Sequence, residues 1–232
     1  MRSAFLIAWR EIRWEILGDR GSVLRLGFFA ILPVLFAFTS GPQPGDLALL
    51  TLALQSALFP AVSGVALIAS TFTQEKENGT LVPLLAAPVR DIDIVVGKLL
   101  GMIVPVLAVC AGSVTVFYAL ASGRLGVARV AHALPIPILY ALLTVALLYL
   151  LTAGSWALIL AAVVRTSRAG QQLVGLLIGL SIALFASLGV AAARLGDGWP
   201  LVVLGVLLVG ADVAALAIAR RVWRREEVLA RL

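Results

Sequence analysis

Cysteine, histidine and charged side chains are all scarce in this chain. It has one cysteine, Cys110, and one histidine, His132, and only 13% of its residues are charged, against roughly 25% in an average soluble domain. A single cysteine excludes an intrachain disulfide, and a lone histidine without a neighbouring ligand is a poor metal site. The sequence therefore predicts neither redox chemistry nor a bound metal.

The patterns that phosphate chemistry and hydrolysis require are also missing. No G-x-x-x-x-G-K-[ST] motif occurs, and "GKLLG" at Gly97 has neither the spacing nor the hydroxyl of a phosphate-binding loop. No Ser–His–Asp set and no paired carboxylates stand in a plausible pocket. We expect a protein that is not an enzyme and binds no cofactor, so that any ATP and Mg²⁺ belong to another chain.

The N-terminal residues lack the apolar core of a cleavable signal peptide, because charged residues interrupt them. One stripe at helical spacing is formed by Phe5, Trp9, Ile12 and Ile16, and a second by Ile7 and Trp14. Tryptophans, mixed charges and the absence of a full span favour an interfacial helix over residues 1–23, lying along the inner leaflet. The alternative is a cytoplasmic extension that packs on nothing in particular.

Long apolar runs dominate the remainder. The chain is 62% hydrophobic with a mean hydropathy of +1.08, more apolar surface than 232 residues can bury in a soluble core. A span needs about 20 apolar residues. The sequence predicts an all-α polytopic membrane protein, one transmembrane domain over 1–232, with six spans near 24–40, 51–72, 94–121, 134–164, 170–193 and 199–219; the first is short and the fourth long.

The distribution of positive charge predicts the orientation. With six spans and both termini cytoplasmic, fifteen of the 18 lysines and arginines fall on the inner side, which agrees with the positive-inside rule. This explains the net charge of +6 better than nucleic-acid binding does. We expect a multi-pass protein of the cytoplasmic (inner) membrane in contact with lipid.

A charged stretch, residues 73–93, interrupts the apolar runs between the second and third spans. Gly79 can break a helix at low cost and Thr80 can cap a new one, while Pro88 ends it. The pattern predicts a short cytoplasmic helix with an apolar side at Leu81, Leu84 and Leu85. From the residues alone, a docking helix and an ordinary connecting loop are equally good interpretations.

The sequence "QEKENGTLVPLLAAPVRDIDIVVGKLL" resembles the segment that type-2 ABC transporter permeases carry between their second and third spans. The resemblance rests on a Glu-rich run, Gly-Thr-Leu, a Leu-rich turn, a proline and a Gly-Lys pair; here these are Glu75, Glu77, Gly79, Thr80, Leu81, Leu84, Leu85, Pro88, Gly97 and Lys98. About 28 residues fit closely, and the six-span plan, the N-terminal helix and "VVRTSRAGQQLVGLLIGL" extend a looser similarity over the whole chain.

The resemblance implies a mechanism and a set of partners. Such permeases dimerise, with a second copy or a homologue, and bind two separate ABC ATPase subunits. The segment after the second span acts as a coupling helix that fits a cleft in the ATPase, and the N-terminal helix is the family's connecting, or elbow, helix. The chain would then be the transmembrane subunit of an ATP-driven ABC exporter, and the residues from Glu75 to Pro88 named above would couple it to the ATPase.

Several residues inside the apolar runs are candidates for the translocation path. Ser56, Ser63 and Ser70 recur every seven residues with Gln55 beside them, and the face lines a path or forms a packing seam. Asp212, the one acid deep in an apolar run, either faces the path or makes a structural hydrogen bond to a neighbouring helix. In the fifth predicted span, small residues recur every four positions and form a ridge: Gly175, Gly179, Ala183 and Ser187. We interpret this ridge first as a site of close helix packing at a dimer seam.

Two other functions remain open. Haem-export permeases of cytochrome c maturation have similar length, six spans and a similar coupling segment, although the "EKENGT" wording fits the general type-2 pattern better. A non-transporting membrane scaffold is the alternative of a different class, but it has no need of a Leu-rich docking segment bounded by helix breakers.

Overall fold

The structure is a computed structural model that describes residues 2–16, 18, 20–39, 45–77, 91–163, 172–180, 183 and 199–222. Within these ranges every regular element is a helix and none is a strand. The elements are α1 (Arg2–Arg10), the π-helical η1 (Glu11–Ile16), α2 (Arg20–Thr39), α3 (Asp46–Glu77), α5 (Asp91–Leu125), α6 (Val127–Ala133), α7 (Ile136–Val163) and α9 (Trp199–Val222); residues 172–180 are also helical.

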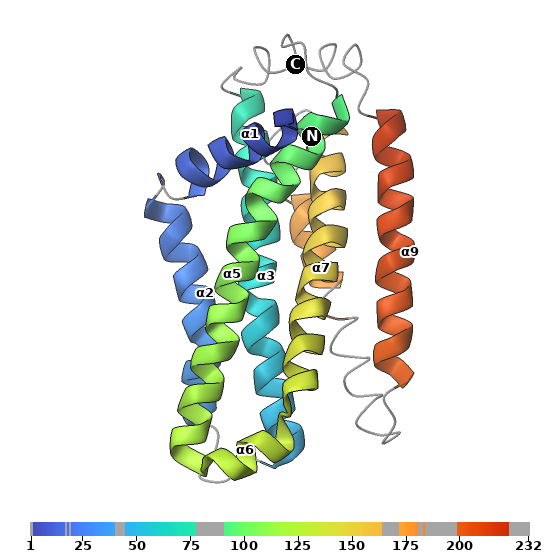
Figure 1. Cartoon of the computed structure of the whole chain (residues 1–232). Helices are drawn as coiled ribbons and strands as arrows, with labels where there is room; N and C mark the ends of the chain where they lie inside the picture. The colour runs from blue at the N-terminus through green and yellow to red at the C-terminus, as the bar shows by residue number, and fades with distance from the viewer. Residues whose placement is uncertain are drawn as a thin grey trace.

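The long helices run side by side as a bundle, and two short helices lie across its ends (Figure 1). α1 crosses one end, where α3 finishes and α5 starts; we call this the α1 end. α6 crosses the opposite end, between α5 and α7; we call this the α6 end. Gly126, whose φ is 90°, separates α5 from α6, and this backbone conformation is one that glycine adopts without strain.

Three described helices are long and apolar enough to cross a membrane: Ala48–Thr71, Val96–Leu125 and Ile136–Ala157. They correspond to the second, third and fourth predicted spans. A shorter apolar stretch, Gly205–Ala215, lies within the sixth. α2 covers the first predicted span, but it begins with Arg20 and carries Arg25, and it is not among the three. The fifth predicted span is only partly within the described residues.

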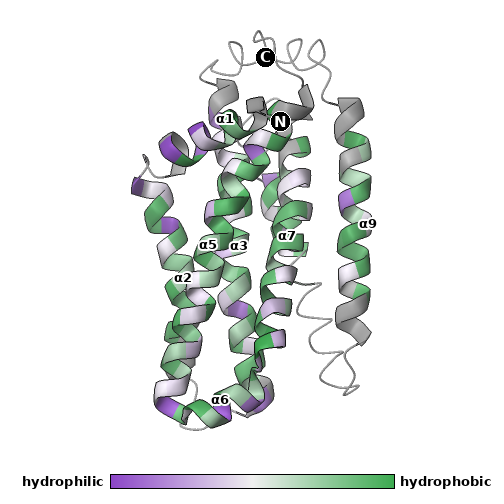
Figure 2. Ribbon diagram, in the orientation of Figure 1, coloured by the Kyte–Doolittle hydropathy of each residue, from purple (hydrophilic) through white to green (hydrophobic). Residues whose placement is uncertain are grey.

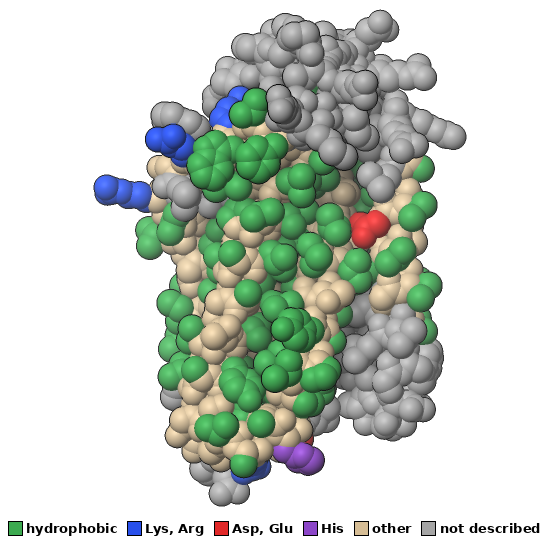
Figure 3. All heavy atoms as spheres, viewed as in Figure 1, with side chains coloured by type: hydrophobic (Ala, Val, Ile, Leu, Met, Phe, Trp, Pro, Cys, Tyr) green, Lys and Arg blue, Asp and Glu red, His purple; other side chains and the backbone are tan. Residues whose placement is uncertain are grey.

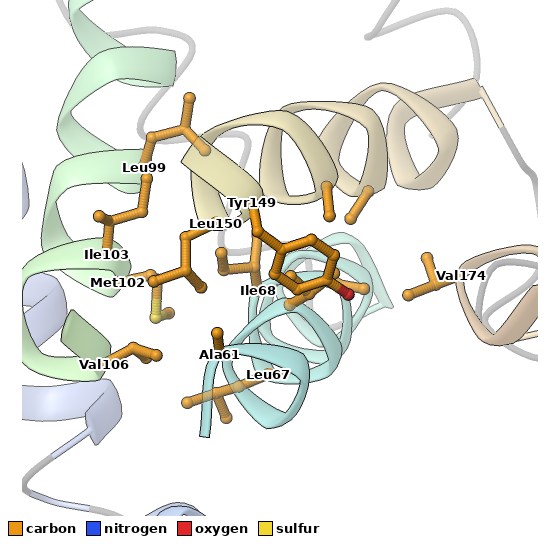
Figure 4. Packing of buried hydrophobic residues seen from close by; sticks show 14 of the residues in the cluster. Ala61, Leu67, Ile68, Leu99, Met102, Ile103, Val106, Tyr149, Leu150 and Val174 are labelled. Atoms are coloured by element: carbon orange, nitrogen blue, oxygen red, sulfur yellow. The ribbon is translucent and has the colours of Figure 1, made fainter. Parts of the chain in front are cut away.

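The core is built from the inner faces of α3, α5 and α7. Near the α1 end, one apolar cluster joins α3 to α5 and α7, as Figure 4 shows for Ile68, Met102 and Leu150. Val174 reaches the same cluster from the helical residues 172–180. A second cluster, which includes Phe117, Val130 and Leu134, fills the bundle toward the α6 end. Close packing along its length makes the bundle one continuous body.

The outside of the bundle is apolar as well. Exposed large hydrophobic side chains occur on α2, α5, α7 and α9, among them Phe28, Val104 and Val206. Figure 2 shows hydrophobic colour along the helices, and Figure 3 shows blue Lys and Arg side chains toward the ends. A surface of this kind is suited to an apolar solvent, in agreement with the three helices that are long and apolar enough to cross a membrane.

Buried hydroxyl groups link neighbouring helices. The Ser113 hydroxyl of α5 donates to the Ala30 carbonyl of α2 over 2.8 Å. The Thr152 hydroxyl of α7 lies 2.8 Å from the Leu148 carbonyl and 3.4 Å from the Leu208 carbonyl of α9. Such hydrogen bonds are typical of packed membrane helices, which have no hydrophobic force between them in lipid.

Candidate functional site

The N-terminal helix packs on α5 through a small face. Ile7, Ala8 and Glu11 are buried, whereas Phe5 is 69% and Trp9 57% exposed. These positions follow helical spacing, so one side of α1 faces the protein and the other faces outward. The two aromatic residues of the predicted stripe therefore lie on the outward face, and the face with Ile7, Ala8 and Glu11 makes the contact with the bundle.

A buried carboxylate lies at the centre of this contact. Glu11 is fully buried, and its Oε1 is 3.2 Å from Nζ of Lys98, which is only 5% exposed. Nη2 of the neighbouring Arg10 also donates to Oε1 over 3.0 Å, from a side chain that is half exposed. The second carboxylate oxygen, Oε2, has no hydrogen-bond partner within the described part of the chain. An ion pair thus joins residues 87 positions apart in sequence.

The two helix backbones approach closely beside this ion pair. A Cβ atom added to Gly101 would lie 2.7 Å from the Glu11 Cβ and 2.9 Å from the Ala8 carbonyl oxygen. Only glycine fits this close approach. Gly101 follows Lys98 by three residues and therefore lies on the same face of α5. We call Ala8, Glu11, Lys98 and Gly101 the α1–α5 joint.

The predicted coupling segment begins and ends at the same end of the bundle. Glu75 and Glu77 belong to the last turn of α3, and Asp91 is the first residue of α5. The other predicted coupling residues lie outside the described residues: Gly79, Thr80, Leu81, Leu84, Leu85 and Pro88. The joint thus lies on the helix that directly follows this segment, two turns beyond its first residue.

The serine face of α3 is turned into the protein. Ser56 is fully buried and donates to the Ala53 carbonyl over 2.7 Å, and Ser63 is almost as deeply buried. Ser70 is half-buried and donates to the Leu67 carbonyl, and Gln55 is half-buried. Two of these hydroxyls therefore bond to their own helix, which satisfies them locally in an apolar environment.

Ser63 also lines a cavity of about 240 Å³ between α2, α3 and residues 172–180. Its walls are mainly apolar, and its polar side chains come from α2 and α3. Residues from all three segments line it, among them Ser22, Arg25 and Phe29 of α2, Val62 and Ser63 of α3, and Ile178. Among the residues that the structure describes, no Asp or Glu lines this cavity. A mostly apolar hollow with a few polar groups has the character of a small-molecule site.

Asp212 lies on α9 beside α7. Its carboxylate is partly buried and has the Thr152 side chain as its hydrogen-bonding neighbour. The same hydroxyl is close to the Leu208 carbonyl of α9. The structure thus brings Asp212 to a contact between two helices, apart from the cavity that Ser63 lines.

The small-residue ridge is uncovered in the single chain. Gly175, Gly179 and Ala183 are exposed, and a Cβ added at either glycine would meet nothing within 4 Å. Ser187, the fourth residue of the ridge, lies outside the described residues. Among the described residues no cluster of three or more His, Cys, Asp or Glu side chains could hold a metal ion.

Sequence reasoning missed the α1–α5 joint. The family pattern included Lys98, but no sequence pattern singled out Glu11. One signal was available: Glu11 follows Ile7 by four residues and Ala8 by three, so a lone acid completes an otherwise apolar helix face. Its partner could not be found without the structure.

Together, an all-helical bundle with three long apolar helices and a lipid-facing surface defines a multi-pass α-helical membrane protein. The family model described as "ABC-2 family transporter protein" matches residues 49–201. The chain belongs to this family of transport permeases, as the resemblance in its charged segment predicted. A search of curated proteins found no match to the chain.

Proposed function

We propose that the chain is the transmembrane subunit of an ATP-driven ABC exporter that works as a dimer with two separate ATPase subunits. Residues 73–93 dock on the ATPase and pass its movement to the membrane helices. One observation carries the proposal: in a member of the ABC-2 family, α3 and α5 both reach the α1 end, and the segment that joins them contains the Glu-rich, Gly-Thr-Leu and Leu-Leu pattern.

The proposed topology has six spans, with the N-terminal helix lying at the inner membrane surface and both termini in the cytoplasm. Three candidate spans, the helical residues 172–180 and the helices α2 and α9 support the number. Exposed Phe5 and Trp9 support the interfacial position of α1, because aromatic side chains favour the boundary between headgroups and acyl chains. The distribution of Lys and Arg supports the orientation.

We further assign the translocation path to the side of the bundle that carries Ser63 and the cavity beside it, with Gln55 and Ser56 along the same helix. The exposed ridge of Gly175, Gly179 and Ala183 fits a close helix contact with the second permease copy. Asp212 belongs with these polar groups as a candidate path residue, although Thr152 is its present neighbour.

The test is co-purification of the tagged chain with the ABC ATPase encoded next to it. The wild-type chain should retain the ATPase, and the combined change Glu77→Ala and Leu84→Asp should lose it, because it removes a charge and the apolar side of the docking helix. The complex should also hydrolyse ATP at a rate that differs from that of the free ATPase.

A matched control places the same kinds of change at the other end of the bundle. Arg129→Ala with Val127→Asp removes one charge from a half-buried position of α6 and adds one acid at an exposed position, and it should leave the complex intact. A wild-type chain that retains no ATPase would contradict the proposal, as would equal loss of the ATPase in both double variants.

A further inference from the structure

The α1–α5 joint contains more polar structure than a packing contact requires. Buried ion pairs contribute little net stability, since two well-packed apolar residues often serve as well or better. The 3.2 Å pair between Glu11 and Lys98 is almost entirely removed from solvent. A gain in stability therefore does not by itself account for this ion pair.

The surroundings of the joint distinguish it from the apolar contacts of the bundle. Two apolar helices in lipid can separate or slide at low cost, because lipid tails replace the lost contacts. Two buried charges separate at a higher cost, because the ion pair between them is lost while both stay largely removed from solvent. Gly101 allows the backbones to come together at the same point, so the joint resists both separation and sliding.

The joint also lies where movement would enter the membrane helices. Lys98 is seven residues after Asp91, or about 10 Å along the helix, and a helix is stiff over two turns. On the other side, Glu11 is the first residue of η1, the π-helical turn between α1 and the start of α2 at Arg20. π-helical turns are often found at functional sites.

We infer that the Glu11–Lys98 ion pair is a transmission element, which makes the N-terminal helix follow every displacement of the start of α5. Movement of residues 73–93 then reaches α5 directly, and through the ion pair it reaches α1, η1 and the beginning of α2. Glu11 and Lys98 are positioning residues in this mechanism. The inference rests on the proposed function for the source of the movement, but the existence of a rigid joint does not.

The first experiment tests the joint in the isolated chain, reconstituted in lipid nanodiscs, by amide hydrogen exchange. Glu11→Gln and Lys98→Met should each increase the exchange of residues 2–16 by about tenfold or more. The swapped pair, in which Glu11→Lys is combined with Lys98→Glu, should recover most of the protection from hydrogen exchange. Arg13→Gln, which alters an exposed cation of η1 outside the joint, is the matched control and should change nothing.

If residues 2–16 are equally protected from exchange in the wild type and in both single variants, the ion pair does not hold α1 to α5 and the inference is wrong. A swapped pair no better protected than the single variants would also overturn it. If Lys98→Met does not fold, the swapped pair and Lys98→Arg, which keeps the charge, still carry the test: both should protect residues 2–16, and exposure in both would count against the inference.

The second experiment tests transmission in the complex with the ABC ATPase, compared without nucleotide and with ATP plus vanadate. In the wild type, exchange should change at residues 91–105 and at residues 2–16 together. In Lys98→Met, or in Glu11→Gln if that variant folds better, the change at 91–105 should persist and the change at 2–16 should disappear. The swapped pair should restore it.

The outcomes separate this inference from the proposed function. If the variant keeps both responses, the ion pair does not transmit movement, even where the joint is rigid. If the wild-type chain forms no complex with the ATPase, the proposed function fails and transmission fails with it. The first experiment would then still report whether Glu11 and Lys98 hold the two helices together.

Discussion

The two ends of α5 are held in opposite ways. At the α1 end, α5 buries Lys98 against Glu11 and brings Gly101 against the backbone of α1. At the α6 end, it turns at Gly126 into α6, and the fully buried side chains there are apolar: Val130 and Leu134, whereas Arg124 is exposed and Arg129 half-buried. The same helix thus ends in a charged joint on one side and in an apolar cap on the other.

The difference follows from what each end must do in an apolar solvent. An apolar cap closes the bundle and tolerates small shifts, because dispersion contacts change gradually with distance. A buried ion pair holds one geometry, because the cost of separating its charges rises steeply in a medium of low dielectric constant. The geometry of α5 indicates a defined position at the α1 end and simple closure at the α6 end.

The largest effect is expected from a charge reversal in the joint. Glu11→Lys places two cations in a site that excludes solvent, and breaking a buried pair costs about 3–5 kcal/mol. The variant should lose much of its folded population in detergent, measured as thermal unfolding by size-exclusion fluorescence. Arg13→Glu, the same size of charge change on an exposed position, should unfold within a few degrees of the wild type. Equal stability of the two variants would show that burial does not matter at Glu11.

A change of intermediate size is expected at the α6 end. Leu134→Ala removes a fully buried side chain and should cost about 2–4 kcal/mol through the cavity that it leaves. Because the cap has no part in the joint, hydrogen exchange of residues 2–16 should remain as in the wild type even though the protein unfolds at a lower temperature. Loss of protection at both ends would remove the distinction between them. Val127→Ala, on an exposed position of α6, is the control.

The smallest effect is expected from glycine-to-alanine changes in α5, which test the close approach of α1 and α5. The change in stability should have opposite signs at Gly101 and Gly112. Gly101→Ala should destabilise the protein by about 1–3 kcal/mol, since the added carbon meets Ala8 and Glu11. Gly112→Ala meets nothing within 4 Å and should stabilise by up to about 1 kcal/mol through helix propensity. Thermal unfolding of both variants in one detergent provides the measurement, and stabilisation of both would mean that the joint has room for a methyl group.

Sequence patterns predicted the long elements well and the N-terminal helix only in part. The second, third and fourth predicted spans coincide with α3, α5 and α7, because a run of 20 or more apolar residues has few alternatives to a membrane helix. The family was also readable from the charged segment that follows α3. Phe5 and Trp9, which the sequence assigns to an interfacial helix, are exposed in the structure, whereas the packing of Ile7, Ala8 and Glu11 on α5 was not predicted.

The sequence identified the candidate path and coupling residues, but it did not tell which residues lie next to them in space. The spacing of seven residues places Ser56 and Ser63 on one face of α3, but it does not tell which helices that face contacts. The structure shows that Ser63 faces a cavity lined also by α2, including Arg25, and by residues 172–180. For Asp212 the sequence left two interpretations, and the structure adds Thr152 as its neighbour. The role of these residues in transport stays a prediction, as does that of Glu75 to Pro88 in coupling.

By itself the sequence determined that this is a membrane protein, that it is helical and that it belongs to a family of transport permeases. These are properties of composition and local pattern, because an apolar solvent forces each segment to satisfy its own backbone. Only the tertiary structure decided that Glu11 meets Lys98 and that Gly101 lies beneath α1. A contact between residues 87 positions apart depends on how the helices cross, which no local pattern encodes.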